Sequence, residues 1–241
     1  MKGLKTVFLL AALLLPFTVA AEPTDSFSKA KKLMMERVYF DHRETLYCGA
    51  KFDAKKDIAL PTGFHTDKYI KRSKRLEWEH VVPAENFGRT FSEWRDGHPN
   101  CIDSKGKAFK GRNCASKVSI EYRYMQSDLY NLYPAIGAVN AMRSNYNFTM
   151  MPDAAAVFGT CQVKIDGKKV EPPMESRGQI ARTYLYMEQR YPRYRMSKSQ
   201  KQLMTVWNSQ YPVTSAECKR ADRIAAIQGN ENRFVSEQCQ N

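Results

Sequence analysis

Six cysteines restrict the folding of this chain more than any other feature of its sequence: Cys48, Cys101, Cys114, Cys161, Cys218 and Cys239. None belongs to a Cys-x-x-Cys pair, and no histidine stands at zinc-ligand spacing from them. An even number of cysteines in an exported chain favours disulfides over zinc. Short loop closures favour the pairs Cys101–Cys114 and Cys218–Cys239, which leaves Cys48–Cys161 as a long-range bond.

The N-terminus has the pattern of a secretory signal peptide. Lys2 and Lys5 precede an unbroken apolar run, and small residues follow it, ending in Ala20 and Ala21. The pattern predicts cleavage after Ala20, with cleavage after Ala21 as the alternative. An uncleaved anchor is less favoured, because the apolar run is shorter than the roughly 20 residues that span a bilayer. The protein is therefore expected to be periplasmic or secreted.

The chain is strongly basic, with a formal net charge of +13. Residues 1–20 carry two lysines and no acidic residue, so their removal would leave +11. Such a charge suggests nucleic acid, an anionic membrane surface or an acidic glycan as the partner, and a basic but inert surface is the alternative. Residues 21–241 have the length of one domain with a substantial core, and no repeat or linker divides them.

The spacing of apolar residues predicts a mostly helical fold with a small sheet. Helices are expected over Ser26–Asp41, Ser119–Leu132, Pro134–Met142, Arg177–Tyr191 and Ser199–Gln210. Pro134 suits the first position of a helix, where its missing N–H has no partner to lose. Ser197 and Gln200 have the spacing of a capping box, and Pro192 and Pro212 should end the last two helices.

Two further segments differ from this helical pattern. Arg75–Val82 alternates in the way that a strand does. Phe91–Cys114 is long, charged and rich in turn residues. A loop of this length in a compact domain is usually functional or held by a disulfide, and this one is expected to be both.

The strand places a carboxylate, Glu79, beside a histidine, His80. Metal-assisted hydrolysis of a phosphodiester needs a cation at the phosphate, a base for the attacking water and a cationic donor. Glu79 suits the cation and His80 suits the base. Because neighbours on a strand face opposite sides, a shared site requires either that the phosphate lies between them or that the strand bends before Pro83. The pair is a weak signal by itself, since His80 could equally be a core histidine and Glu79 a surface charge.

The wider string Leu76-Glu-Trp-Glu-His-Val-Val-Pro-Ala84, followed by Asn86-Phe-Gly88, resembles the bacterial endonuclease I family of periplasmic and secreted nucleases. Similar strings continue in the same order: Asp128-Leu-Tyr-Asn-Leu132, Pro134-Ala-Ile-Gly-Ala-Val-Asn140, Arg177-Gly-Gln-Ile-Ala-Arg-Thr-Tyr184, Trp207-Asn208, Tyr211-Pro-Val213, Glu217-Cys218 and Gln228-Gly-Asn230. The resemblance extends over essentially the whole mature chain and is highly specific.

The resemblance implies an α+β fold with a small antiparallel sheet and a ββα-metal (His-Me finger) motif. In that motif two short strands and a helix hold one Mg²⁺ ion, which Mn²⁺ or Ca²⁺ can replace. By motif, Glu79 and Asn140 would bind the metal and His80 would be the general base. Arg112 would contact the phosphate near the reaction centre, with Arg95 as the alternative.

Other residues are expected around this centre. Gln126 and Asn131 should lie near the metal-bound water, although Asn131 could instead cap a helix. Arg95 and Arg143 are expected to contact the substrate. The chain has Gln126 and Tyr130 where members of the family often carry Glu and His, and such changes commonly shift metal affinity without abolishing the chemistry.

The implied substrate is DNA, single- or double-stranded, and RNA as well, with 5′-phosphate products. Basic residues flank the proposed site in the sequence, and contacts of this kind position a duplex without reading bases. They are Lys71, Arg72, Lys74, Arg75, Lys105, Lys107, Lys110 and Arg112. The sequence contains no recognition helix, so cleavage without sequence specificity is expected, by a monomer that does not bind membranes.

Two other functions share part of this sequence pattern. An exported DNA-binding protein without catalysis would also need the charge and the disulfides, but it would not need Glu79, His80 and Asn140 together. A cationic surface protein would favour a compact basic amphipathic helix, whereas the charge here is dispersed over loops.

Overall fold

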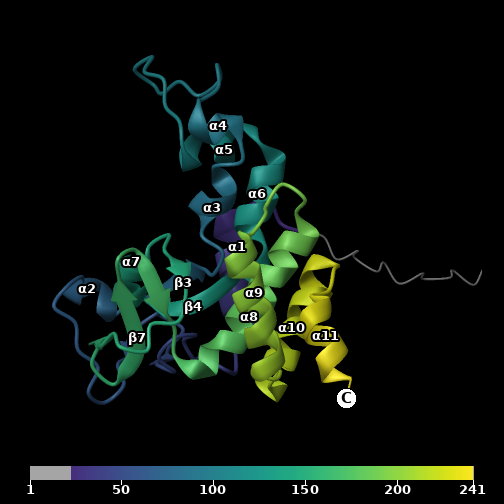
Figure 1. The fold of residues 1–241 in the computed structure, drawn as a ribbon. Helices are drawn as coiled ribbons and strands as arrows, with labels where there is room; N and C mark the ends of the chain where they lie inside the picture. The colour runs from purple at the N-terminus through teal and green to yellow at the C-terminus, as the bar shows by residue number, and fades with distance from the viewer. Residues whose placement is uncertain (1–22, 241) are drawn as a thin grey trace, which may run out of the picture.

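Residues 23–240 are described by the computed structural model of the protein, so the expected signal-peptide cleavage lies outside the described residues. Helices dominate this part of the chain (Figure 1). The α-helices are α1 (Phe27–Leu33), α2 (Ile70–Ser73), α3 (Ala84–Gly88), α4 (Ser92–Arg95), α5 (Arg112–Val118), α6 (Ile120–Ser127), α7 (Gly137–Arg143), α8 (Met174–Arg190), α9 (Lys198–Gln210), α10 (Ser215–Gln228) and α11 (Arg233–Cys239). None of these helices is long and apolar enough to cross a membrane.

The strands form small separate sheets, which confirms the expected α+β class. One pairs β1 (Lys51–Phe52) with β2 (Ile58–Ala59), and one pairs β3 (Leu76–His80) with β4 (Leu132–Ile136), both antiparallel. The third has the order β5-β8-β7-β6, from β5 (Asn147–Phe148), β6 (Ala156–Phe158), β7 (Cys161–Asp166) and β8 (Lys169–Glu171). Its β5–β8 pair is parallel, so this sheet is mixed.

The first helical segment is shorter than the helix that the apolar spacing predicts over Ser26–Asp41. Ser26 caps α1 by accepting a hydrogen bond from Lys29 N, and the chain continues as a π-helix, η1 (Met34–Val38). The helical backbone ends at Val38, ahead of the predicted boundary.

The expectation that Pro134 opens a helix is wrong. Pro134 lies in the middle of β4, opposite Trp78, and the carbonyl oxygen of Pro134 accepts a hydrogen bond from Leu46 N at 2.8 Å. The helix α7 begins three residues later, at Gly137. The predicted helix Ser119–Leu132 is also divided, because α6 ends at Ser127 and a short 3₁₀ turn, η2 (Leu129–Asn131), leads into β4.

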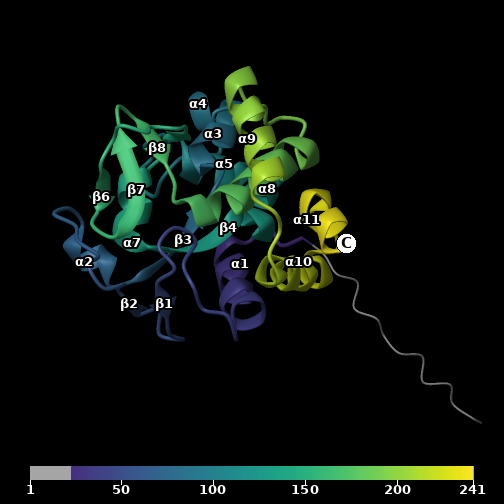
Figure 2. The same ribbon diagram turned by 60° about the horizontal axis from the view of Figure 1, so that its bottom comes forward.

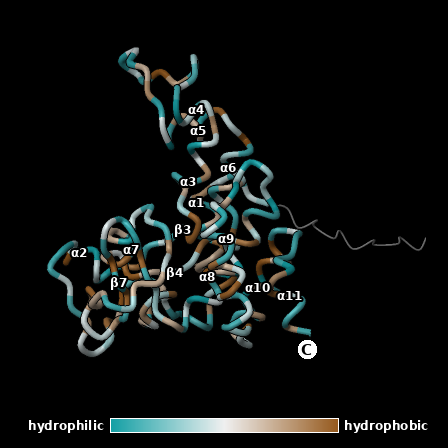
Figure 3. The backbone as a smooth tube through the Cα atoms, viewed as in Figure 1, coloured by the Kyte–Doolittle hydropathy of each residue, from teal (hydrophilic) through white to brown (hydrophobic). Residues whose placement is uncertain are grey.

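The long helix α8 lies at the centre of the fold and packs against α9 and α11 (Figures 1 and 2). Its buried side chains include Tyr184 and Met187, which join the hydrophobic core as predicted. The predicted cap of α9 is present, since Ser197 Oγ accepts a hydrogen bond from Gln200 N. Apolar segments gather around this helix and around β7, whereas the outer loops are largely hydrophilic (Figure 3).

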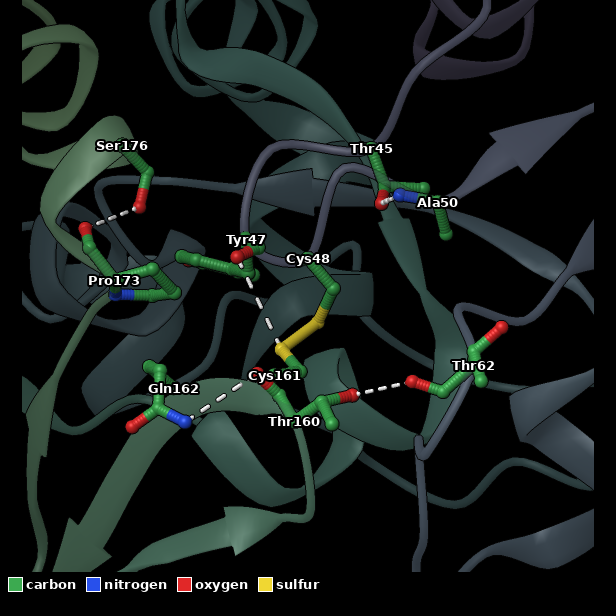
Figure 4. The surroundings of a disulfide bond; sticks show 10 residues. All are labelled: Thr45, Tyr47, Cys48, Ala50, Thr62, Thr160, Cys161, Gln162, Pro173 and Ser176. Carbon is green, nitrogen blue, oxygen red and sulfur yellow. Dashed lines mark hydrogen bonds between the residues drawn. A yellow bond between two sulfur atoms is a disulfide. The ribbon is translucent and has the colours of Figure 1, made fainter.

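Three disulfides are present, Cys48–Cys161, Cys101–Cys114 and Cys218–Cys239. The last two are the pairs that short closures favour, and the first is the long-range bond that they leave. The first spans 113 residues and ties the turn after Tyr47 to the start of β7 (Figure 4). That turn is closed by Thr45, whose Oγ1 accepts a hydrogen bond from Ala50 N at 2.9 Å. The position of Tyr47 is therefore fixed from both sides.

Residues 96–111 form an arm that projects away from the body between α4 and α5 (Figure 1). An isolated bridge joins Ile102 to Ala108, and Asp103 closes the turn by accepting hydrogen bonds from Lys105 N and Lys107 N. The Cys101–Cys114 disulfide holds the arm at its base. The long loop is thus pinned by a disulfide, as the sequence predicts.

Candidate active site

A cavity of about 270 Å³ opens at the end of β3. Four of the predicted site residues line it, although they come from three different parts of the chain: Glu79, His80, Arg112 and Asn140. Its other lining residues are Phe27, Trp78, Pro83, Ala84, Glu85, Ser144 and Asn145. A larger cavity, of about 730 Å³, lies between residues 38–49 and the helices α8 and α10, and none of the predicted catalytic or metal-binding residues lines it.

Glu79 has one carboxylate oxygen in contact with the protein. Its Oε1 accepts a hydrogen bond from the Tyr47 hydroxyl at 2.7 Å and lies 3.0 Å from Arg143 Nη1. Its Oε2 accepts no hydrogen bond within residues 23–240. Burial raises the pKa of Glu79, and the nearby Arg143 guanidinium opposes this rise. Oε2 of Glu79 is therefore available to bind a cation.

His80 is held in a single tautomer. Its Nε2 lies 2.8 Å from the carbonyl oxygen of Gln126, which can only accept, so Nε2 carries the proton. The other ring nitrogen, Nδ1, has no hydrogen-bond partner within residues 23–240. The ring of Phe27 stacks on the imidazole with centroids 4.9 Å apart. Burial, and next the charge of Arg112, lower the pKa of His80 to about 3, so the imidazole is neutral and the lone pair of Nδ1 is unprotonated.

Asn140 reaches the cavity from α7. Its Nδ2 donates a hydrogen bond to Glu77 Oε2 at 2.7 Å, and this leaves Oδ1 available. The helix α7 follows β4 directly, so the β3–β4 pair and α7 bring Asn140 to the cavity that Glu79 and His80 line.

Of the two candidate arginines, Arg112 lies at the cavity. It is exposed and is the first residue of α5, immediately after the arm. Arg95 is exposed on α4, donates from Nη1 to the carbonyl oxygen of Arg89 at 2.7 Å, and does not line the cavity. The geometry therefore favours Arg112 for contact with a phosphate bound there.

Arg143 lies inside the protein, with 1% of its surface exposed. In addition to its contact with Glu79, it donates hydrogen bonds to the carbonyl oxygens of His80 and Val81. Its guanidinium also lies over the ring of Phe148. A side chain this buried cannot reach a nucleic acid at the surface, so its position suits support of Glu79 and not the expected contact with substrate.

Gln126 and Asn131 support the site through the backbone. The carbonyl oxygen of Gln126 accepts the hydrogen bond from His80 Nε2, while the Gln126 side chain donates from Nε2 to Ser116 Oγ. Asn131 caps no helix; its Oδ1 accepts from Val82 N at 2.7 Å and its Nδ2 donates to Val82 O at 3.0 Å. Neither side chain lines the cavity. Tyr130 is buried and donates to backbone carbonyl oxygens of Ala221 and Asn230.

Sequence reasoning missed several residues of this site. Tyr47 and Phe27 belong to segments with no catalytic pattern, so no local signal could have found them. Glu77 lies in the same string as Glu79, two residues earlier on the same strand, and that spacing was an available signal. Glu85 and Asn145, which also line the cavity, are bonded to each other, with Asn145 Nδ2 donating to Glu85 Oε2.

The donor set suits a hard cation. Within residues 23–240 no group of three or more His, Cys, Asp and Glu side chains is arranged to hold a metal ion. The cavity instead offers one carboxylate oxygen, from Glu79, and one amide oxygen, from Asn140, neither of which accepts a hydrogen bond from the described residues. Mg²⁺ prefers oxygen ligands, keeps several waters and needs only one or two protein groups, so these residues fit it.

Comparison with known proteins gives a consistent result. A sequence model of the family Endonuclease I matches residues 32–239. The chain is 40% identical to an extracellular deoxyribonuclease of Aeromonas hydrophila, over 88% of this chain and 90% of the relative. It is 38% identical to a periplasmic deoxyribonuclease of the same species, over 99% and 97% of the two chains. It is also 38% identical to Endonuclease-1 of Buchnera aphidicola subsp. Baizongia pistaciae (strain Bp), over 89% and 84%.

Proposed function

Because the chain belongs to the endonuclease I family, we propose that it is a metal-dependent endonuclease that hydrolyses the phosphodiester bonds of DNA without sequence specificity. The observation that carries this proposal is the cavity at the end of β3, where Glu79, Asn140 and a neutral His80 meet. A protein that only bound DNA would have no need of this combination.

Glu79 and Asn140 would hold the cation, each through its unbonded oxygen. A bound Mg²⁺ ion, or Mn²⁺ or Ca²⁺ in its place, would neutralise charge on the scissile phosphate and on the leaving oxygen. Arg143 and Tyr47 hold Glu79 through Oε1, so the carboxylate is oriented before any cation arrives. On this proposal, the antiparallel β3–β4 pair followed by α7 would serve as the ββα-metal motif that the family resemblance implies.

His80 acts as the general base. Its unprotonated Nδ1 takes a proton from water, and the resulting hydroxide attacks the phosphorus in line with the 3′-oxygen. The bond between phosphorus and that oxygen breaks, the 3′-oxygen takes up a proton from solvent water to become a hydroxyl group, and the other product keeps a 5′-phosphate. The hydrogen bond from Nε2 to the carbonyl oxygen of Gln126 fixes the ring and stabilises the imidazolium that forms. Arg112, exposed at the edge of the cavity, steadies the extra negative charge on the phosphate oxygens.

Substrate binding rests on charge. The lysines and arginines of residues 71–75, and Lys105, Lys107 and Lys110 of the arm, are all exposed. Contacts of these side chains with phosphates would hold DNA, and RNA as well, without reading bases. Relatives named as extracellular and as periplasmic support export to one of these locations. We expect the protein to act there as a monomer.

Plasmid cleavage tests the proposal. Supercoiled DNA should be nicked in Mg²⁺ and left intact in EDTA. His80→Ala should lower the cleavage rate by about 10²- to 10⁴-fold, because it removes the base, while the Kd for duplex DNA stays near that of the unmodified protein. Cleavage by the variant at the original rate would overturn the assignment of His80, and cleavage in EDTA would overturn the need for a metal.

A further inference from the structure

Glu77 lies between an arginine and the amide of Asn140. Arg72 donates from Nε to Glu77 Oε1 at 2.7 Å and from Nη2 to Oε2 at 2.5 Å, which is a bidentate pair. The same Oε2 accepts the hydrogen bond from Asn140 Nδ2 at 2.7 Å. Arg72, Glu77 and Asn140 therefore form a chain of contacts from the surface of α2 to the cavity.

This chain of contacts decides which way the amide of Asn140 faces. An ionised carboxylate can only accept hydrogen bonds, so the group of Asn140 that touches Glu77 must be the NH₂. The opposite orientation would bring the amide oxygen against the carboxylate. Glu77 thus directs Oδ1 away from itself and keeps it free.

The lack of a side chain at Gly137 allows α7 to approach Arg72 and Glu77. A Cβ atom added at Gly137, the first residue of α7, would lie 2.5 Å from Arg72 O and 2.8 Å from Glu77 Oε1. Only glycine lets the start of α7 approach Arg72 and Glu77 so closely, and α2 lies beside α7 as a result (Figures 1 and 2).

We propose that Glu77 is a positioning residue of the metal site, which holds the amide of Asn140 so that Oδ1 is presented to the cation, with Arg72 fixing the carboxylate. The inference rests on the proposed role of Asn140 as a metal ligand. Groups that orient a ligand typically change metal affinity by about 10- to 100-fold when they are removed. Without Glu77, the amide would rotate and would have to be ordered again each time a cation bound.

Two substitutions of equal length separate the hydrogen bond from the charge. Glu77→Gln removes the charge but keeps an oxygen that can accept from Asn140 Nδ2. Glu77→Met has a similar length and no acceptor. We expect the Kd for Mn²⁺, measured by calorimetry on the metal-free full-length mature protein, to rise about 10- to 100-fold in Glu77→Met and only a few-fold in Glu77→Gln.

Two control variants complete the calorimetry. Glu121→Met removes another half-buried glutamate that accepts two hydrogen bonds from an arginine, Arg193, and Glu121 does not line the cavity. Its Kd for Mn²⁺ should equal that of the unmodified protein. Asn140→Ala tests the ligand itself and should lose most of the affinity.

A second measurement needs no metal. In the NMR spectrum of the metal-free protein, the side-chain NH₂ of Asn140, identified by its absence in Asn140→Ala, should show one proton shifted downfield by the carboxylate. The shift should persist in part in Glu77→Gln and vanish in Glu77→Met. This reading compares folded proteins directly, because the remaining backbone signals report whether each variant folds.

The outcomes separate the role of Glu77 from the assignment of Asn140 as a metal ligand. Unchanged Mn²⁺ affinity in Glu77→Met, beside a loss in Asn140→Ala, would overturn the role of Glu77 and leave the nuclease proposal intact. Unchanged affinity in Asn140→Ala would overturn the ligand assignment, and the positioning role with it. Equal losses in Glu77→Gln and Glu77→Met would show that charge and not the hydrogen bond matters, which also contradicts the inference.

Discussion

At the scale of single residues, the site is defined by which atom of each side chain is already in use. Oε1 of Glu79 contacts Tyr47 and Arg143. His80 donates from Nε2 to Gln126, and Asn140 donates from Nδ2 to Glu77. In each case the atom that remains is the one that the proposed chemistry requires. The proposed catalytic residues can be named from the sequence because they lie in a specific motif, whereas their tautomers and orientations depend on contacts between distant segments.

The neutral state of His80 predicts an unusual pH dependence. Because its pKa lies near 3, below the ordinary value, the imidazole stays unprotonated when the pH falls from 8 to 5.5. At saturating metal, kcat/KM should therefore fall much less than the roughly tenfold loss that an imidazole with an ordinary pKa near 6.5 would give over this range. A decline of one logarithmic unit per pH unit beginning near pH 6.5 would contradict the prediction.

The buried pair of Arg143 and Glu79 predicts a large stability loss. Arg143→Met leaves the Glu79 carboxylate in the interior without the guanidinium that pairs with it. This loss should lower the free energy of unfolding by about 3–5 kcal/mol. Urea unfolding followed by circular dichroism measures the loss. Arg223→Met, which breaks the exposed Arg223–Asp41 pair, should cost far less. Similar losses in the two variants would mean that the buried pair has no special role.

At the scale of elements, the sequence was misleading where tertiary contacts compete with local preference. Pro134 suits a helix start, but pairing with β3 places it in a strand, and α7 begins only where Gly137 allows close approach. The helix α10 was absent from the sequence-based expectation, although Thr214 and Glu217 have capping-box spacing. In the structure Thr214 caps that helix by accepting a hydrogen bond from Glu217 N, so this spacing is a genuine local signal for α10.

Gly137 gives a prediction whose sign is informative. Replacing a helical glycine by alanine usually stabilises a protein slightly, because it restricts the unfolded chain. Gly137→Ala should instead destabilise by about 1–3 kcal/mol, since the new methyl group would collide with the backbone at Arg72. Thermal unfolding of the metal-free protein measures this change. A raised Tm would show that α2 and α7 can separate without cost.

At the scale of the whole molecule, the sequence predicted class, cysteine pairing and core more reliably than shape. A mostly helical fold with a small sheet follows from periodicity, and the disulfide pairs follow from cysteine spacing. The division of the strands into three small sheets, with one parallel pair, does not, because strands of two or three residues carry too little pattern to be recognised. The projection of the arm likewise depends on contacts at its base.

The overall positive charge predicts binding that weakens with salt. Each phosphate that a lysine or arginine neutralises releases counterions, so two such contacts alone would raise the Kd about tenfold between 50 and 200 mM salt. His80→Ala allows this to be measured by fluorescence anisotropy on duplex DNA without cleavage. A Kd that does not change with salt would exclude the exposed lysines and arginines as the main source of affinity.

The scarcity of protein oxygens around the proposed cation has a physiological consequence. An ion that is held by one carboxylate and one amide keeps most of its hydration shell and exchanges readily with its surroundings. The protein would then not need to acquire its metal during folding or export. Its catalytic output would follow the divalent ions of the fluid into which it is released, and dilution or chelation there would switch it off without unfolding it.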